Sequence, residues 1–254
     1  MKYRKVTDSA DALHAYIEHL PAKEYKAISP SSLGGCMRSH YWKIKGFPST
    51  TPPNYGALVN FQVGHLWEEM IAKAHAKNGT LVKWFEDGKD EAFYDEETHL
   101  GGLPDMLIKR GENLVVLDSK TVNSAYFQYA NKYKKFDDWV TDNKDYVYQQ
   151  VAYVYLMRKA GYDVTNAVLS FASKDDGYIG LEFEVSVDDE LLNKVLARAK
   201  KLKEYLDNEQ LPPCSCEGWK TGYCGYGNPS TRQANTKKKI VNTECCEEAF
   251  LTKE

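Results

Sequence analysis

A short apolar run that ends in charged residues is the feature that most constrains this chain. Leu114–Leu117 is uninterrupted Leu-Val-Val-Leu, typical of a strand that is buried in a sheet. Asp118 and Lys120 follow directly. Side chains two positions apart on a strand point to the same face, so we expect this carboxylate and this ammonium to meet. Together they could hold a divalent cation and orient a water molecule, although a solvated strand end is the alternative.

Helices are predicted where apolar residues recur every three or four positions, and strands where β-branched and aromatic residues lie between turn signals. The predicted helices span residues 8–20, 29–46, 55–77, 145–159 and 188–208. The predicted strands span residues 80–85, 91–94, 105–109, 114–117, 166–171 and 179–187. This order predicts an α/β fold in which helices flank a central mixed sheet.

Composition excludes several classes of protein. The chain of 254 residues has 33 Lys and Arg against 36 Asp and Glu, so any nucleic-acid surface must be local. The longest apolar run, Val151–Met157, is far shorter than the roughly 20 residues of a membrane-spanning helix. Asp8 and Asp11 interrupt any signal-peptide core. We therefore expect a cytoplasmic protein without a membrane partner. Its six cysteines are too sparse for a disulfide framework, and the clustering of five of them near the C-terminus indicates metal or redox chemistry.

A second carboxylate precedes the strand before Leu114. Asp105 follows Leu103 and Pro104 and opens the predicted strand 105–109. Two paired strands would place Asp105 close to Asp118, and neighbouring carboxylates are costly unless a cation neutralises them. The alternative is an ordinary turn, where Asp is common.

Two pairs of polar residues have helical i,i+4 spacing. His65 and Glu69 share a face of the predicted helix 55–77 with apolar residues, so we expect that face to point inward. Gln149 and Tyr153 are paired in the same way on the predicted helix 145–159. For both pairs, hydrogen-bonded polar side chains at the edge of the core are the alternative.

In this order the motifs resemble the PD-(D/E)xK nuclease superfamily, and more narrowly its RecB-type branch. The patterns are G-x-x-x-H-x-x-x-E (here without its leading glycine), G-x-P-D, D-x-K after an apolar strand, and Q-x-x-x-Y on a helix. The Ser-Pro-Ser-Ser-Leu-x-x-Cys stretch from Ser29 and the C-terminal cysteines are similar to those of iron–sulfur exonucleases, including the CRISPR adaptation exonuclease and the AddB-type nuclease domain. The resemblance covers residues 29–226 and implies a restriction-endonuclease-like core.

The resemblance also implies an activity and its residues. It implies a metal-dependent exonuclease that hydrolyses phosphodiester bonds of single-stranded or end-opened DNA in recombination or repair. The implied ligands of Mn²⁺ or Mg²⁺ are His65, Asp105, Asp118 and the backbone carbonyl of Ser119. Lys120 would position the attacking water and stabilise charge on the phosphate. Glu69 would bind the metal through a water molecule or contact the residues that ligate it. Gln149 and Tyr153 would hold Lys120 and the substrate phosphate.

Four cysteines form a second group: Cys36, Cys214, Cys216 and Cys224. Four thiolates suit a 4Fe–4S cluster or tetrahedral Zn²⁺, and the resemblance implies the iron–sulfur cluster, held as a clasp around the core. The C-x-C spacing of the second and third departs from the C-x-x-C of the family. Cys245 and Cys246 are further candidates, and free buried thiols are the alternative.

Four regions are expected along the chain. Residues 1–54 form a helical segment with Cys36, residues 55–187 the nuclease core, residues 188–228 a helix with the cysteine cluster, and residues 229–254 a polar tail. The expected partners are DNA and either recombination proteins or a second copy of the chain, in a bacterial cytoplasm or, for a phage protein, that of its host. A structure-specific endonuclease and a non-catalytic DNA-binding subunit are the alternative functions.

Lysine is locally dense in three segments, residues 132–135, 194–203 and 237–239. Tyr126, Tyr129 and Tyr133 accompany the first segment, where aromatic faces beside cations could stack exposed bases. For residues 194–203 we favour a solvated helix face.

Overall fold

The computed structural model describes residues 7–20, 24–86, 88–126, 143–175, 177, 179–215, 224–227, 233–234 and 240–241. The helical elements are α1 (Asp8–Glu18), the 3₁₀ turn η1 (Pro30–Ser32), α2 (Met37–Ile44), α3 (Tyr55–Lys77), α6 (Lys144–Lys159) and α7 (Asp189–Asp207). The strands are β1 (Leu81–Trp84), β2 (Phe93–Asp95), β3 (Leu100–Gly102), β4 (Met106–Arg110), β5 (Asn113–Val122), β6 (Val164–Ser173), β7 (Ile179–Ser186), β8 (Gln233–Ala234) and β9 (Ile240–Val241). Four of the five predicted helices are confirmed to within two residues at each end, and so is the α/β class.

Five strands form a mixed central sheet in the order β1-β4-β5-β6-β7. Strands β5 and β6 are parallel, and the other neighbours are antiparallel. Parallel neighbours require a crossover connection, which here contains α6. Helix α6 therefore runs back against β5 and β6, and its first turn lies near the ends of both strands.

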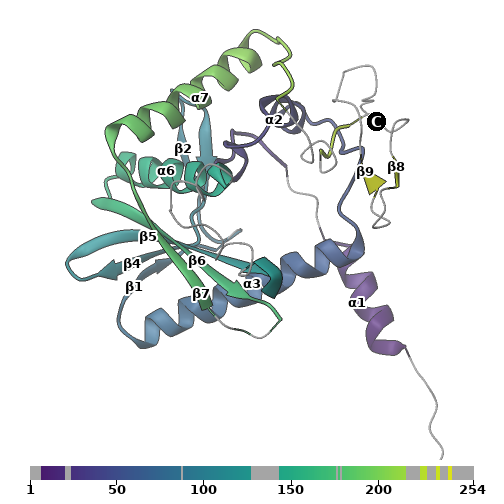
Figure 1. The fold of residues 1–254 in the computed structure, drawn as a ribbon, viewed down its shortest axis with the longest axis horizontal. Helices are drawn as coiled ribbons and strands as arrows, with labels where there is room; N and C mark the ends of the chain where they lie inside the picture. The colour runs from purple at the N-terminus through teal and green to yellow at the C-terminus, as the bar shows by residue number, and fades with distance from the viewer. Residues whose placement is uncertain are drawn as a thin grey trace, which may run out of the picture.

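Helices cover both faces of this sheet (Figure 1). On one face, Leu107, Val116 and Leu169 pack into a large core with residues of α6 and α7. On the other face, Met106, Ile108, Val115, Leu117 and Val168 pack with Ala72 of α3. Alternate residues of β4 and β5 belong to opposite cores, as the strand period of two requires. The sequence therefore places the side chains of residues 105, 118 and 120 on the α6 face.

The prediction of a single helix over residues 29–46 is wrong. The structure has the short turn η1, a break, and then α2, with Cys36 as the residue before the helix. The chain passes α6 so closely that a Cβ on Gly34 would lie 2.5 Å from the Cα of Asp145. Arg198 of α7 donates hydrogen bonds to the carbonyls of Leu33 and Gly35, so the break is fixed by tertiary contacts that the sequence does not show.

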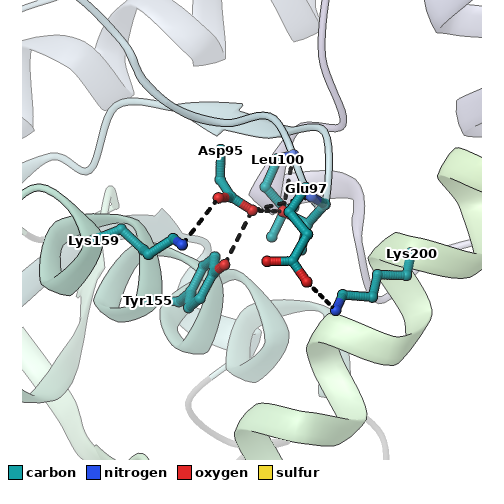
Figure 2. A network of polar contacts seen from close by, with 7 residues as sticks. Asp95, Glu97, Leu100, Tyr155, Lys159 and Lys200 are labelled. Carbon is teal, nitrogen blue, oxygen red and sulfur yellow. Dashed lines mark hydrogen bonds and ion pairs between the residues drawn. The ribbon is translucent and has the colours of Figure 1, made fainter.

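Strand β3 was not predicted, because two of its three residues are glycines, which are uncommon in strands. Gly101 is required by packing, since a Cβ there would lie 2.8 Å from the Cβ of Ala27. A buried carboxylate closes the hairpin that β3 forms with β2 (Figure 2). Asp95 accepts hydrogen bonds from the N–H and hydroxyl of Thr98, at 3.0 and 2.6 Å, and from the hydroxyl of Tyr155 on α6, at 3.0 Å.

Within the described part of the chain, no helix is both long enough and apolar enough to span a bilayer.

Candidate active site

The end of β5 brings a carboxylate and an ammonium into contact. Strand β5 extends beyond the predicted residues 114–117 and includes Asp118 and Lys120, which point to the same face. The Lys120 Nζ lies 2.6 Å from Asp118 Oδ2, and the Asp118 side chain is fully buried. The predicted convergence of these two residues is therefore confirmed, and the alternative of a solvated strand end does not hold.

Asp105 lies beside this pair. Its neighbour Met106 is paired with Leu117 across β4 and β5, which brings Asp105 next to Asp118. The backbone N–H of Ser119 donates a 2.9 Å hydrogen bond to Asp105 Oδ2. Burial and the negative charge of Asp118 raise the pKa of Asp105 from 3.8 to about 8, and the charge of Lys120 only partly offsets them. The two carboxylates thus repel each other in a place that water reaches poorly.

The ammonium of Lys120 remains charged in this site. Burial alone would lower the pKa of Lys120, but the charges of Asp118 and Asp105 outweigh burial and raise it. A lysine with a raised pKa carries a fixed positive charge at neutral pH and does not accept a proton. It can attract an anion or orient a water molecule.

Helix α6 lies over the site, on the sheet face to which Asp118 and Lys120 point. Gln149 Nε2 donates a 3.1 Å hydrogen bond to Asp118 Oδ1, whereas the resemblance implied that it would hold Lys120 and the substrate phosphate. Tyr153 is only 6% exposed, and burial, followed by the charges of Asp118 and Asp105, raises its pKa. Its ring lies 3.4 Å from the position of a Cβ on Gly102, so it packs against the backbone of β3. Tyr153 therefore borders both the site and the hairpin.

The face of α3 that meets the sheet differs from the predicted one. The side chain of His65 is 70% exposed and Phe61 is 55% exposed, so the prediction that this face points inward is wrong. Glu69 forms an ion pair with Lys73, at 2.6 Å, rather than with the site. The structure does not gather His65, Asp105 and Asp118 into a three-residue metal group.

Glu68 is the residue of α3 that the sequence analysis missed. Its side chain is 18% exposed, accepts a 3.1 Å hydrogen bond from the indole of Trp84, and is close enough for its charge to raise the pKa of Asp105. No sequence pattern singles out Glu68. It is placed by the packing of α3, whose Gly64, one turn earlier, lies against Thr121 of β5, 3.6 Å from the position of a Cβ. A third carboxylate therefore lies near the strand end.

The segments that carry the predicted cysteine ligands lie side by side. Arg38 donates a hydrogen bond to the carbonyl of Pro212, at 2.7 Å, and Ser49 donates one to the carbonyl of Gly225, at 2.7 Å. The hydroxyl of Tyr226 donates to the carbonyl of Phe47, at 3.3 Å. Hydrogen bonds thus join residues 38–49 to residues 212–226, a contact that we call the clasp, and the cysteine-ligated clasp that the sequence analysis expected stays a prediction.

The cysteines themselves are placed only in part. Cys224 is buried in the main core, Cys36 precedes α2, and Cys214 is disulfide-bonded. Cys216, like Cys245 and Cys246, lies outside the described residues. Among the residues that are described, no three His, Cys, Asp or Glu side chains are grouped closely enough to hold a metal ion.

Two of the three lysine-rich segments, residues 132–135 and 237–239, also lie outside the described part of the chain, as do Tyr129 and Tyr133. On α7, Lys200 and Lys201 are exposed and Lys203 is partly exposed, and all three form ion pairs with acidic neighbours. This agrees with a solvated face for residues 194–203.

Comparisons with known proteins find similarity only at the level of solved structures. An alkaline exonuclease (LHK-Exo) from Laribacter hongkongensis is 14% identical, with a TM-score of 0.49 over 78% of this chain and 93% of that one. The structure of LHK-Exo in complex with dAMP is 13% identical, with a TM-score of 0.49 over 78% of this chain and 93% of that one. A protein described as SSO0001 is 16% identical, with a TM-score of 0.45 over 85% of this chain and 90% of that one. No protein-family model matches, and no curated protein matches significantly. Because all three TM-scores are below 0.5, the function must be inferred from the residues of the site.

Proposed function

We propose that this chain is a metal-dependent deoxyribonuclease that hydrolyses phosphodiester bonds. The observation that supports it most is the convergence of Asp105, Asp118 and Lys120 at one strand end, with Gln149 bound to Asp118. Two carboxylates beside one ammonium leave negative charge that a proton or a cation must balance. In the metal-free protein a proton on Asp105 can balance part of this charge, as the raised pKa of Asp105 indicates. Buried carboxylates of this kind are costly unless they coordinate or pair, which favours a functional role.

The donor atoms fit a hard divalent cation, Mg²⁺ or Mn²⁺. Mg²⁺ is usually held by one or two carboxylates, with water and phosphate oxygens completing its coordination. Asp105 and Asp118 would provide those carboxylates. The N–H and C=O of a strand residue lie on the same edge of the strand, so the Ser119 carbonyl faces the side of Asp105 and would be a further ligand. When bound, the cation would supply a water molecule of lowered pKa and positive charge beside the phosphate.

On α3 the proposal differs from the residues that the resemblance implies. Glu68, rather than Glu69, would face the metal or its water, because only Glu68 influences Asp105. We retain His65 as a candidate ligand, next to Glu68, since its Nδ1 lies 3.7 Å from Glu68 Oε2.

The protein's own residues would then act on water and phosphate. Lys120 would hold the attacking water and stabilise the charge that builds up on the phosphate, without acting as the base, because its pKa is raised. Gln149 would fix Asp118 through Oδ1 and keep Oδ2 directed at Lys120.

The finer parts of the proposal depend on the resemblance in sequence. These are exonuclease action, single-stranded or end-opened DNA as substrate, a role in recombination or repair, and a cytoplasmic location. The same holds for a 4Fe–4S cluster, or Zn²⁺, held by Cys36, Cys214, Cys216 and Cys224. In the structure Cys214 is disulfide-bonded, so it would have to be reduced to a thiol to become a ligand. The hydrogen-bonded clasp supports the approach of the two cysteine segments.

A cleavage assay on end-labelled linear DNA and on circular single-stranded DNA tests the function. We expect linear DNA to be shortened from an end in Mg²⁺ or Mn²⁺, the circle to stay intact, and EDTA to stop the reaction. Lys120→Ala should lower the rate by at least about 100-fold. Lys174→Ala is the matched control, because the Lys174 side chain is exposed and donates only to Asn60 among the hydrogen bonds described.

Each other outcome points to a different conclusion. Near-wild-type cleavage by Lys120→Ala would show that the D-x-K assignment is wrong. Cleavage of the circle would favour an endonuclease. A folded wild-type protein that binds DNA but cleaves neither substrate with metal would favour a non-catalytic subunit.

A further inference from the structure

A second tyrosine of α6 lies closer to the end of β5 than Tyr153 does. Tyr146 precedes Gln149 by three residues, so the two side chains share a helix face with Tyr153. Because α6 runs opposite to β5, the first turn of the helix is the part nearest to Lys120. Tyr146 therefore lies nearer than Gln149 to the start of α6 and the end of β5, and Tyr153 lies one turn beyond Gln149 in the other direction.

The sheet register fixes Tyr146 beside Lys120. Lys120 of β5 is paired with Phe171 of β6, and paired residues point to the same face. The ring of Tyr146 meets the ring of Phe171 edge-on, with centroids 5.5 Å apart and an interplanar angle of 78°. Tyr146 therefore lies over the residue that is next to Lys120 on the α6 face.

The two tyrosines differ in their access to solvent. Tyr153 is buried, and its ring lies against Gly102. Tyr146 is only half-buried. A phosphate that enters from solvent would reach the hydroxyl of Tyr146 before it could reach that of Tyr153.

Electrostatics agree with this placement. Burial raises the pKa of Tyr146, and the charges of Lys120 and Asp118 act on it in opposite directions. The hydroxyl is thus close enough to feel both charged groups of the site, and it stays protonated at neutral pH. A protonated phenol can donate a hydrogen bond.

We propose that the Tyr146 hydroxyl donates a hydrogen bond to a non-bridging oxygen of the scissile phosphate, beside the Lys120 ammonium. Tyr153, to which the resemblance assigns a phosphate contact, would instead hold the β2–β3 hairpin against α6. The inference rests on the proposed phosphodiesterase function and deepens it. It adds a substrate-binding residue that none of the sequence patterns includes.

The test compares Tyr146→Phe with Tyr148→Phe, a buried tyrosine of the same helix, under single-turnover conditions. A hydrogen bond to a charged oxygen contributes enough that its loss should slow Tyr146→Phe by about 10- to 100-fold. Tyr148→Phe should stay within about twofold of wild type. Phenylalanine keeps the ring contact with Phe171, so circular dichroism and thermal unfolding should show folded protein in both cases.

A substrate in which one non-bridging oxygen is replaced by sulfur separates contact from packing. For one of the two phosphorothioate diastereomers, the rate penalty in wild type should be larger than in Tyr146→Phe, because the variant has already lost the bond to that oxygen. If the role of Tyr146 is purely structural, sulfur substitution should slow wild type and Tyr146→Phe by the same factor for both diastereomers. That result would overturn the inference.

The result for wild type distinguishes the two proposals. If wild type cleaves with metal and Tyr146→Phe cleaves equally fast, only the inference about Tyr146 fails. If folded wild type shows no metal-dependent cleavage of phosphodiesters, the proposed function fails and the inference fails with it.

Discussion

Asp105 is the residue whose ionisation the fold controls most strongly. Its pKa is raised from 3.8 to about 8 by burial and by Asp118, so between these values the folded protein binds a proton that the unfolded chain releases. A group that holds its proton more tightly when folded stabilises the protein at low pH, and this contribution is lost as pH rises through its folded pKa. Metal-free protein should therefore lose free energy of unfolding as pH rises from about 4 to 8.

Urea unfolding in EDTA across this pH range measures the effect. Asp105→Asn cannot titrate and should remove most of the decline. Asp90→Asn should not, because the pKa of this partly buried carboxylate elsewhere is lowered by its bond to Lys83, so that it titrates below this range. Added Mg²⁺ should bind more tightly as pH rises to about 8, because it must displace the proton. Identical pH profiles for wild type and Asp105→Asn would contradict the raised pKa.

Glu68 and Glu69 offer a matched pair of adjacent carboxylates. We expect Glu68→Gln to weaken Mg²⁺ binding and cleavage by about 10- to 100-fold, as losses of groups close behind metal ligands do. Glu69→Gln should cost only an exposed i,i+4 ion pair with Lys73, about 0.3–0.5 kcal/mol of stability. Calorimetric titration with Mg²⁺ and the cleavage assay give both values. A larger effect at Glu69 would restore the residue that the motif indicated.

At the scale of elements, α3 shows what a sequence pattern can and cannot establish. Its bounds are confirmed, because the Pro-rich stretch that ends at Asn54 and the Asn78-Gly79 pair mark them in the sequence. The structure adds that the Asn54 side chain caps the first turn. The prediction of its buried face is wrong: Phe61 is exposed, and so are Leu66 and Met70, although all three are apolar. Apolar periodicity identifies a buried face only when the exposed face is polar, and α3 has apolar residues on both.

The hairpin of β2 and β3 depends on one buried carboxylate (Figure 2). Burial alone would raise the pKa of Asp95, but hydrogen bonds from Thr98 and Tyr155 outweigh it and hold the pKa below 3.8. Tyr155→Phe should therefore lower the free energy of unfolding by about 1–3 kcal/mol near neutral pH. Because the folded pKa of Asp95 is lowered, this contribution should be present above about pH 4 and should shrink as pH falls below it.

Urea unfolding of Tyr155→Phe at pH 7 and at pH 3 checks both the size and the sign. Tyr94→Phe is the control in the same hairpin, because its hydroxyl bonds His99 at an exposed position. It should change stability by less than about 0.5 kcal/mol. An effect of Tyr155→Phe that grows toward pH 3 would be inconsistent with a lowered pKa for Asp95.

At the scale of the whole molecule, the sequence predicted which strand and helix ends would meet. Asp105, Asp118, Lys120 and Gln149 converge because strand order and the crossover helix leave few arrangements for an apolar strand that ends in charge. Glu68 and Tyr146 could not be predicted in the same way. The position of Glu68 depends on the packing of α3 against β5, and that of Tyr146 on the ring of Phe171, which are contacts between segments distant in sequence.

The clasp between the two ends of the described chain leads to the last prediction. The Thr50 hydroxyl shares hydrogen bonds with the carbonyls of Gly225 and Gly227, at 3.1 and 2.9 Å, so side-chain-to-backbone hydrogen bonds contribute to the clasp. Ligation by four thiolates would add far more, on the order of 10 kcal/mol for structural zinc sites. The two contributions can be separated by substitution.

Thr50→Val should lower the melting temperature by a few degrees and leave the iron and zinc content of anaerobically purified protein unchanged, because it removes only hydrogen bonds. Cys36→Ser should remove the metal and give insoluble or protease-sensitive protein, whereas Cys245→Ser, a candidate beyond the four, should do neither. Metal analysis, visible absorbance and limited proteolysis of the three variants measure these effects. A soluble Cys36→Ser variant with unchanged metal content would show that Cys36 is not a ligand and that hydrogen bonds alone close the clasp.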